Sequence, residues 1–184
     1  LYYDRGKKKE TIEYLKKAEE IALKTADAKL IQKIYDNIYT VNFWCNNFNI
    51  ALKYGLKALS YAYKIKDTAS IAHDLRYISD AYSELNIDNK AIVYNLKAIH
   101  YLNYYDKLSQ AKLLSNIGEY YLHKGNPKKA DEFLEKAFQK SPNAYTYSVV
   151  ADMYIEKGKF IKAKEVMDKA PLPTNDFDNL KKLS

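Results

Sequence analysis

The chain has 184 residues, 47% of them hydrophobic, which is enough for one compact domain or a short run of stacked repeats. Only five glycines and four prolines occur, which argues against the many tight turns of an all-β fold and favours an all-α fold. The single cysteine excludes an intrachain disulfide, and no run approaches the roughly 18 apolar residues of a membrane span.

The net charge of +7 raises the question of nucleic acid as a partner. The basic residues are almost all lysines, with arginine only at Arg5 and Arg76. Because arginine is the residue suited to bidentate contacts with phosphate and guanine, its scarcity weakens that interpretation. The lysines also alternate with acids, as in EYLKKAEE and DEFLEKAFQK, which is typical of solvated helix faces. A basic helical nucleic-acid-binding module therefore remains the alternative function.

An octet ending in Lys-Ala recurs along the chain and predicts a helix in each copy. Four of its five copies begin with alanine, and their apolar residues return at helical spacing. Successive copies start 40, 40, 39 and 33 residues apart, a period typical of repeat proteins. The copies are TIEYLKKA (11–18), ALKYGLKA (51–58), AIVYNLKA (91–98), ADEFLEKA (130–137) and AKEVMDKA (163–170).

The fifth residue before each octet predicts a turn that follows another helix. Glycine or asparagine fills this position in every copy, and both tolerate the left-handed conformation that ends a helix. Each unit therefore reads as helix, short turn, helix. Asp27, Asp67 and Asp106 lie near the start of the next first helix, where a carboxylate can cap free backbone amides. The turn residues are Gly6, Asn46, Asn86, Gly125 and Gly158.

This pattern resembles the tetratricopeptide repeat, which implies an α-solenoid of antiparallel helix pairs wound into a right-handed superhelix. Residues 111–142 carry nearly the whole signature of the family: Leu114, Ile117, Gly118, Tyr121, Gly125, Ala130, Leu134, Ala137 and Pro142. The resemblance extends over residues 1–184 as one domain. The units are 1–26 (partial), 27–66, 67–105, 106–142 and 143–173, with 174–184 as a capping helix or the start of a further unit.

Several positions depart from the family pattern. Tyr39, Ser79 and Ala151 replace the small glycine of the first helix, Gly55 and Asn95 replace a large apolar residue, and Asn42 replaces an aromatic one. The longer spacings resemble repeat regions attached to bacterial signalling and transcription regulators. That resemblance implies the sensor or adaptor part of a larger bacterial protein.

The two ends of the sequence carry expectations of their own. The chain opens LYYDRGKKKE without methionine, so we expect an excised piece of a longer protein, and the sequence leaves open whether a targeting segment was cut away with the rest. The compartment therefore stays open between cytoplasm and periplasm. A truncated repeat array exposes apolar surface, which predicts self-association through residues 1–20. At the other end, Thr174 or Asn175 is the expected N-cap of a short amphipathic run.

Neither the glycines nor the histidines predict catalytic or metal chemistry. The stretch IGEYYLHKGNPKKA (117–130) lacks the order of a phosphate-binding loop, and its glycines stand at repeat positions. His73, His100 and His123 are widely separated and have no cysteine partner, so we expect no metal site. Cys45 is expected to be a buried small apolar residue. We predict no catalytic residue, no cofactor and no enzymatic activity.

In the family that the chain resembles, the first helices line a concave groove that recognises a protein or peptide. The four facing columns are Lys33, His73, Lys112 and Tyr145; Asn37, Tyr77, Asn116 and Val149; Thr40, Asp80, Glu119 and Asp152; and Trp44, Glu84, His123 and Glu156. The last two columns hold several carboxylates, which favours a cationic partner. Equally, these acids can be ordinary solvated residues with local pairs such as Arg76 and Asp80.

Other features of the groove limit the class of partner that it can bind. The family's lysine–asparagine clamp for a terminal carboxylate is not matched, because Asn37 is followed by His73 and Tyr77 in the next unit. That mismatch disfavours a receptor for chaperone tails. The chain also holds nineteen tyrosines, most of them expected in the core with their hydroxyls at its edge. The remainder would enrich a recognition surface.

Overall fold

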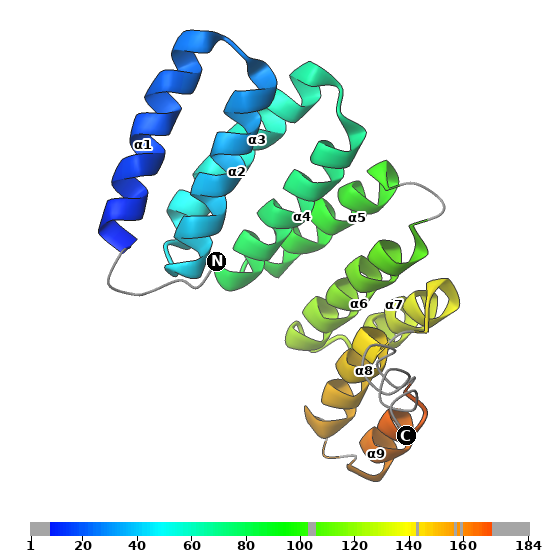
Figure 1. Ribbon diagram of the computed structural model, residues 1–184. Coiled ribbons are helices and arrows are strands. Elements are labelled where there is room, and N and C mark those ends of the chain that lie inside the picture. Colours follow the sequence, from blue (N-terminus) through cyan, green and yellow to red (C-terminus); the bar gives the residue numbers. More distant parts are fainter. Residues whose placement is uncertain (1–7, 103–105, 143, 157, 159, 171–184) are drawn as a thin grey trace, which may run out of the picture. The chain divides into compact units, whose positions relative to one another are not determined.

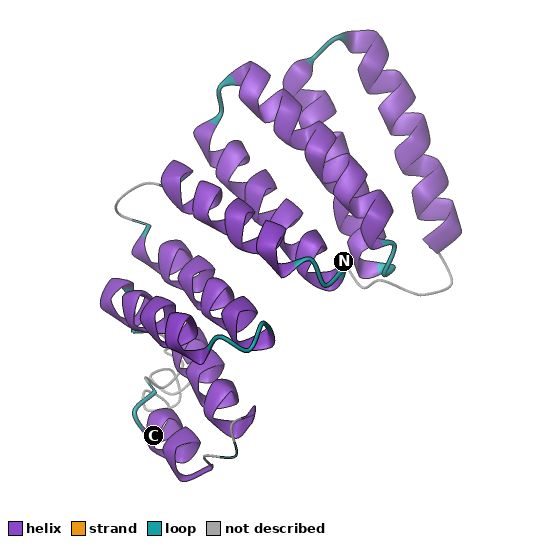
Figure 2. Cartoon of the chain, turned by 180° about the vertical axis from the view of Figure 1, so that it is seen from behind, coloured by secondary structure: helices purple, strands orange, loops and turns teal. Residues whose placement is uncertain are grey.

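The computed structural model describes residues 8–102, 106–142, 144–156, 158 and 160–170. Within these ranges every regular element is an α-helix, which confirms the predicted fold class (Figure 2). No helix in the described ranges is long and apolar enough to cross a membrane. The turn residue Gly6 and the run expected at 174–184 lie outside these ranges. The chain divides into two compact units, residues 1–102 and 103–184, and each is described by itself.

The first unit consists of five helices, each packed against the next in the chain (Figure 1). Its buried side chains form clusters that each join three consecutive helices, one from α1 to α3 and one from α2 to α4. The helices are α1 (Lys8–Thr25), α2 (Ala28–Trp44), α3 (Phe48–Ile65), α4 (Thr68–Glu84) and α5 (Asp88–Tyr101).

The second unit contains the four remaining helices of the described ranges. Helix α6 packs against both α7 and α8, and α8 packs against α9. Its core includes Leu134, Val149 and Val150. The helices are α6 (Lys107–His123), α7 (Pro127–Lys140), α8 (Ala144–Glu156) and α9 (Phe160–Asp168).

The predicted turn residues adopt the left-handed conformation. The φ angles are 60° at Asn46, 57° at Asn86, 67° at Gly125 and 68° at Gly158. Each residue follows the first helix of a pair, and its positive φ lets the chain reverse within a few residues. The prediction from glycine and asparagine is thereby confirmed for the four turns that the structure describes.

The predicted aspartate caps are also confirmed. The Asp27 carboxylate accepts hydrogen bonds from the backbone amides of Lys29 and Leu30, at 2.9 and 3.1 Å. Asp67 makes the equivalent bonds at α4, and Asp106 accepts one at α6. These bonds satisfy amides that the first turn of a helix leaves free. At Asp67 they also lower the pKa of the carboxyl group below its usual value.

The departures from the family pattern exchange large and small residues between paired helices. In α6, a Cβ placed on Gly118 would lie 2.8 Å from Leu134 of α7, so a glycine faces a large residue. Between α2 and α3 the order is reversed, because Gly55 of α3 leaves room for the ring of Tyr39 of α2. A Cβ placed on Gly55 would lie 3.2 Å from that ring. Each pair thus keeps one large and one small residue at the point of closest approach.

The polar pair Ser79 and Asn95 occupies the same contact between α4 and α5. The Ser79 hydroxyl donates to the backbone oxygen of Ala91 at 2.8 Å, which satisfies it. The amide of Asn95 is fully buried, and neither its nitrogen nor its oxygen has a hydrogen-bond partner. Since an unsatisfied buried amide is costly, this contact is a weak point of the first unit.

In the first four octets, the lysine before the final alanine lies over the aromatic ring three residues earlier. The distances from the Lys Nζ to the ring centroid are 4.7 Å for Lys57 over Tyr54 and 5.2 Å for Lys97 over Tyr94. Lys17 over Tyr14 and Lys136 over Phe133 repeat the arrangement. A cation over an aromatic face is attracted by the ring quadrupole. Part of the lysine and tyrosine enrichment therefore stabilises the second helices.

Burial divides the tyrosines and corrects the prediction for the cysteine. Tyr35, Tyr39 and Tyr82 are buried, as expected for repeat positions, whereas Tyr121 is only partly buried. Cys45 was predicted to be buried, and this is wrong, because it is only partly buried. The reason is its place as the C-cap of α2, beyond the last turn that packs against the core.

Candidate functional site

The predicted groove residues of the first unit are accessible on α2 and α4. Lys33, Asn37, Trp44, His73 and Glu84 are exposed, and Thr40, Tyr77 and Asp80 are partly buried. Helices α2 and α4 contact each other through side chains, since Tyr39 donates a hydrogen bond to the backbone oxygen of Tyr77 at 2.6 Å. These helices therefore bring their share of the four columns onto neighbouring surfaces.

In the second unit, the predicted groove residues differ from one another in solvent exposure. Val149 was expected to face the groove, and this is wrong, because it is buried in the core with Leu134 and Val150. The side chains of Tyr145 and Glu156 lie outside the described part of the chain. Lys112, His123 and Asp152 are exposed, and Asn116 and Glu119 are partly buried.

A cavity of about 220 Å³ lies between α2 and α4 of the first unit. It combines aromatic side chains with one ion pair and is open to solvent on one side. Trp44 at its edge is 69% exposed, an unusual state for the largest apolar side chain. The lining residues are Tyr39, Thr40, Phe43, Trp44, Arg76, Tyr77 and Asp80.

A row of stacked aromatic rings forms the floor of this cavity and joins the two helices. Phe43 stacks on Tyr39 at 5.5 Å between ring centroids, and Tyr39 stacks on Tyr77 at 4.3 Å. His73 lies at 4.1 Å from Tyr77 on the far side. Trp44 meets Phe43 edge to face at 6.4 Å. Such contacts hold large side chains in fixed orientations, so the cavity is preformed.

An ion pair forms the polar side of the cavity. The Arg76 guanidinium donates to the Asp80 carboxylate at 2.8 Å and also lies over the Tyr77 ring, 4.8 Å from its centroid. Burial raises the pKa of Asp80 to about 6, and the neighbouring Arg76 charge opposes this effect. The structure thus pairs one of the acids predicted to make the groove negative with a local cation.

A cluster of polar side chains, Gln32 and Asp36 of α2 with His73 and Asp74 of α4, lies next to this cavity on the same two helices. The Gln32 amide donates to Asp36 at 2.7 Å and to both carboxylate oxygens of Asp74, at 3.3 and 3.2 Å. The His73 Nδ1 atom lies 3.5 Å from Asp74 Oδ1 and 4.0 Å from Asp36 Oδ2. Desolvation and the adjacent Asp74 raise the pKa of Asp36 to about 8. These are the side chains in the described ranges that could hold a metal ion.

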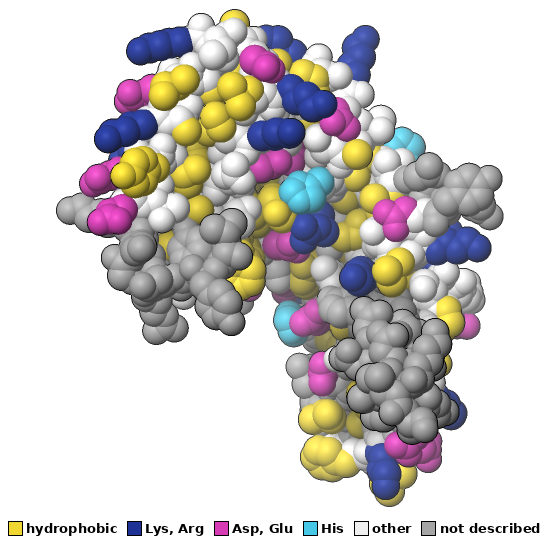
Figure 3. Space-filling view, in the orientation of Figure 1, with side chains coloured by type: hydrophobic (Ala, Val, Ile, Leu, Met, Phe, Trp, Pro, Cys, Tyr) yellow, Lys and Arg dark blue, Asp and Glu magenta, His cyan; other side chains and the backbone are white. Residues whose placement is uncertain are grey.

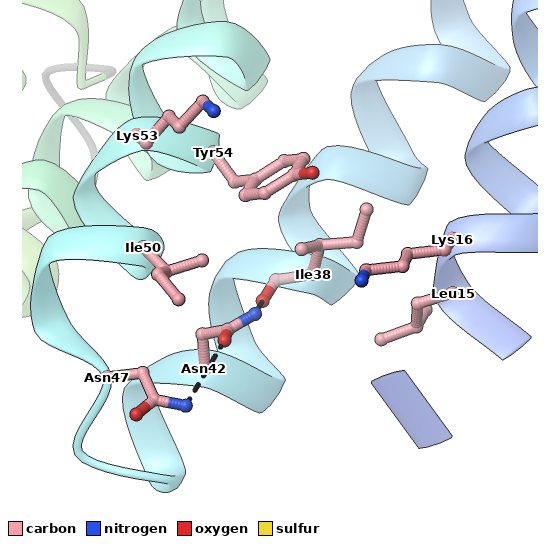
Figure 4. Close-up of a pocket in the computed structure, with 8 residues that line it drawn as sticks. All are labelled: Leu15, Lys16, Ile38, Asn42, Asn47, Ile50, Lys53 and Tyr54. Carbon is pink, nitrogen blue, oxygen red and sulfur yellow. Dashed lines mark hydrogen bonds between the residues drawn. The ribbon is translucent and has the colours of Figure 1, made fainter. Parts of the chain in front are cut away.

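A separate cavity of about 280 Å³ lies between α1, α2 and α3 (Figure 4). It lies where Asn42 replaces the aromatic residue of the family pattern, and the shorter side chain leaves this space. The Asn42 amide is satisfied locally, since it donates to the Ile38 backbone oxygen at 2.8 Å and accepts from Asn47 at 3.4 Å. Besides Asn42, the residues that line this cavity are Leu15, Lys16, Ile38, Asn47, Ile50, Lys53 and Tyr54.

Sequence spacing did not point to the Gln32–Asp74 cluster or to the cavity floor. Asp36 lies 37 residues before His73, on the first helix of the preceding unit, so no short motif contains the three residues. Tyr39 was assigned only a packing role, as a substitute for glycine. Comparing neighbouring columns of successive first helices would have brought these residues together, because stacked repeats place such columns side by side.

Comparisons with known proteins agree with this architecture. Residues 111–143 match the family described as tetratricopeptide repeat. The solved structure of BtubC from P. vanneervenii has a TM-score of 0.70 at 18% identity, covering 94% of this chain and 78% of that one. The structure of MamA has a TM-score of 0.61 at 22% identity, covering 92% and 94% of the two chains. No curated protein sequence matches the chain.

The helix pairs, their turns and the matched repeat define an all-α protein of the α-solenoid class. Within that class, residues 111–143 match the tetratricopeptide repeat in sequence, and the chain as a whole resembles repeat proteins in its fold. At these identities the two solved structures bear on the fold alone. Repeats of this family act as protein-interaction scaffolds, and this general role applies to the chain.

Proposed function

We propose that the chain is a non-enzymatic module that binds a protein or peptide segment on the joint face of α2 and α4. The observation that carries this proposal is the 69% exposed Trp44 beside a preformed aromatic cavity. A tryptophan next to a rigid pocket is typical of residues that dominate binding energy at interfaces. Because the rings are already stacked, little conformational entropy is lost when a partner binds.

The chemistry of the partner follows from the charges around this cavity. Of the two groove acids on α4, Asp80 is partly buried and already paired with Arg76, whereas Glu84 is exposed. Glu84 is therefore the acid that a partner can reach. We propose a segment that inserts one aromatic or aliphatic side chain beside Trp44 and carries a cationic residue facing Glu84. The wider role, as sensor or adaptor region of a larger bacterial protein, rests on the 39- and 40-residue spacings of the repeats.

Selection of random displayed peptides on the whole chain tests the proposal. Peptides that bind should lose at least about tenfold in affinity to Trp44→Ala, measured by fluorescence polarisation, because a central anchor of this kind contributes about 2 kcal/mol or more. Tyr14→Ala is the matched control, since Tyr14 is 70% exposed but lies on α1. Equal loss in both variants, or none in either, would exclude the α2–α4 face.

Charge reversal tests the cationic part of the same proposal. Glu84→Lys should weaken the selected peptides and should flatten the salt dependence of their binding. Glu20→Lys on α1 changes the net charge equally at another exposed position and should have little effect. If both reversals weaken binding alike, the attraction is a property of the net charge and not of this face.

We further infer that α1 supports self-association. Tyr14 and Ile21, seven residues apart on one side of this helix, are 70% and 62% exposed and give it an exposed apolar surface. Light scattering over a range of concentrations should show a dimer that Ile21→Lys dissociates. A monomer at all concentrations would contradict the inference without affecting the binding proposal.

A further inference from the structure

We propose that Asp36, His73 and Asp74 form a binding site for a divalent transition-metal ion, with Zn²⁺ as the best-fitting ion. One ligand atom from each residue lies within 4.8 Å of the other two. Asp36 belongs to α2, and His73 with Asp74 to α4, so a bound ion would bridge the first helices of two successive repeats. The site would not depend on any protein partner.

The distances suit a small tetrahedral ion after modest movements of side chains. Zinc binds imidazole nitrogen and carboxylate oxygen at about 2.0–2.2 Å, which places neighbouring ligand atoms roughly 3.4 Å apart. The His73 Nδ1 atom is 3.5 Å from Asp74 Oδ1 and 4.0 Å from Asp36 Oδ2. His73 is the ligand that can adjust, because 42% of its side chain is exposed.

Charge and hydrogen bonding supply an independent reason for a cation here. Asp36 Oδ1 is buried without a hydrogen-bond partner, and the Asp74 side chain is fully buried. Among the described residues no lysine or arginine forms an ion pair with either carboxylate. A fully buried carboxylate and an adjacent one that is only 20% exposed cannot both ionise cheaply without a cation, whereas a divalent ion would neutralise the pair.

The surroundings also match those of protein metal sites. The Gln32 amide donates to both carboxylates and would fix their orientation around an ion, as outer hydrogen bonds do in known sites. The exposed His73 gives access from solvent and leaves a fourth position for water. Calcium and magnesium fit less well, since they prefer six or more oxygen ligands or several retained waters.

Calorimetric titration of the tag-free, chelator-treated full chain with ZnCl₂ at neutral pH tests the site. We expect saturable binding of one ion per chain, and Co²⁺ should give the visible absorption bands of a low-coordinate site. His73→Ala and Asp36→Asn should each weaken Zn²⁺ binding at least about tenfold. His100→Ala removes another histidine, of α5, and should leave the affinity unchanged.

Two results would overturn the proposal. One is the absence of stoichiometric binding to the wild-type chain, and the other is an unchanged affinity in His73→Ala. Because His73 is partly exposed, its replacement should leave the helices folded, and circular dichroism checks this. Should Asp36→Asn fail to fold, His73→Ala with the His100→Ala control still decides the question.

Discussion

At the scale of single residues, the molecule keeps several polar groups in places that cost it stability. Burial raises the pKa of Asp80 even though Arg76 donates to it. The Asn95 amide is buried between α4 and α5 without partners. Each residue makes a measurable prediction. Asp80 lines the proposed binding surface, whereas Asn95 lies only in the core.

The raised pKa of Asp80 predicts how its contribution changes with pH. Its folded value of about 6 exceeds the ordinary value of 3.8, so between these values the folded chain holds a proton that the unfolded chain has lost. Stability from this group is therefore fully present below about pH 4 and declines as the pH rises to 6. Asp80→Asn, which cannot ionise, should gain stability relative to wild type over that range, as urea unfolding at several pH values would show. A constant difference would contradict the assignment.

Replacing Asn95 should stabilise the first unit. Asn95→Leu removes two unsatisfied polar atoms and restores the large apolar residue of the family pattern opposite the small Ser79. We expect a gain of about 1–3 kcal/mol in the free energy of unfolding, because leaving a buried polar group unsatisfied costs about that much. Asn89→Leu, near the start of α5, serves as a control with the same chemical change and should give no such gain.

At the scale of the helices, paired contacts decide how closely two helices approach. In the contact between Gly118 and Leu134, the large residue, Leu134, belongs to the second helix of the pair. In the contact between Tyr39 and Gly55, the large residue, Tyr39, belongs to the first helix. The same fold therefore tolerates either order, provided that one member of the pair is small. Helix ends are set more locally, by aspartate caps and by asparagine or glycine with positive φ.

A double-mutant cycle at this contact tests the exchange. Gly55→Leu alone should destabilise the chain by about 1–3 kcal/mol, because its side chain would overlap the Tyr39 ring. Tyr39→Gly alone should leave a cavity. The double variant restores the order found at Gly118 and Leu134, so denaturant unfolding should show a coupling of about 0.5–3 kcal/mol in favour of the pair. Additive effects would show that the two residues do not share this space.

At the scale of the whole molecule, the basic charge is spread out. On the face of the first unit that Figure 3 shows, lysine and arginine side chains lie between acidic and hydrophobic ones. Several lysines also lie over aromatic rings, among them Lys57, Lys90 and Lys129. On this face the dispersed lysines do not form the continuous basic surface that follows a phosphate backbone. This distribution favours protein recognition over the nucleic-acid alternative.

Titration with generic duplex DNA and single-stranded RNA tests that alternative. The net charge of +7 should allow weak binding at low salt, which should disappear at physiological salt. Retained affinity with a steep salt slope would instead require several simultaneous phosphate contacts, and would restore the nucleic-acid interpretation. Fluorescence anisotropy with labelled oligonucleotides measures both the affinity and the slope.

The sequence by itself determined the helices, their turns and caps, and the repeat family. These features depend on residues close together in the chain, such as Asp27 before its own helix or Asn46 five residues before an octet, so short-range chemistry predicts them. It also predicted that Trp44, Tyr77 and Asp80 would share one surface, because a regular period carries columns from one unit to the next.

Only the tertiary structure decided which of these residues meet and in what state. It stacked Tyr39 on Tyr77, buried Val149, and brought Asp36 to His73 and Asp74. Each of these outcomes depends on how the side chains of one helix fill the space left by another. That space is set by the sizes of residues on different helices, such as Gly55 of α3 near Ile78 of α4, and no local pattern encodes it.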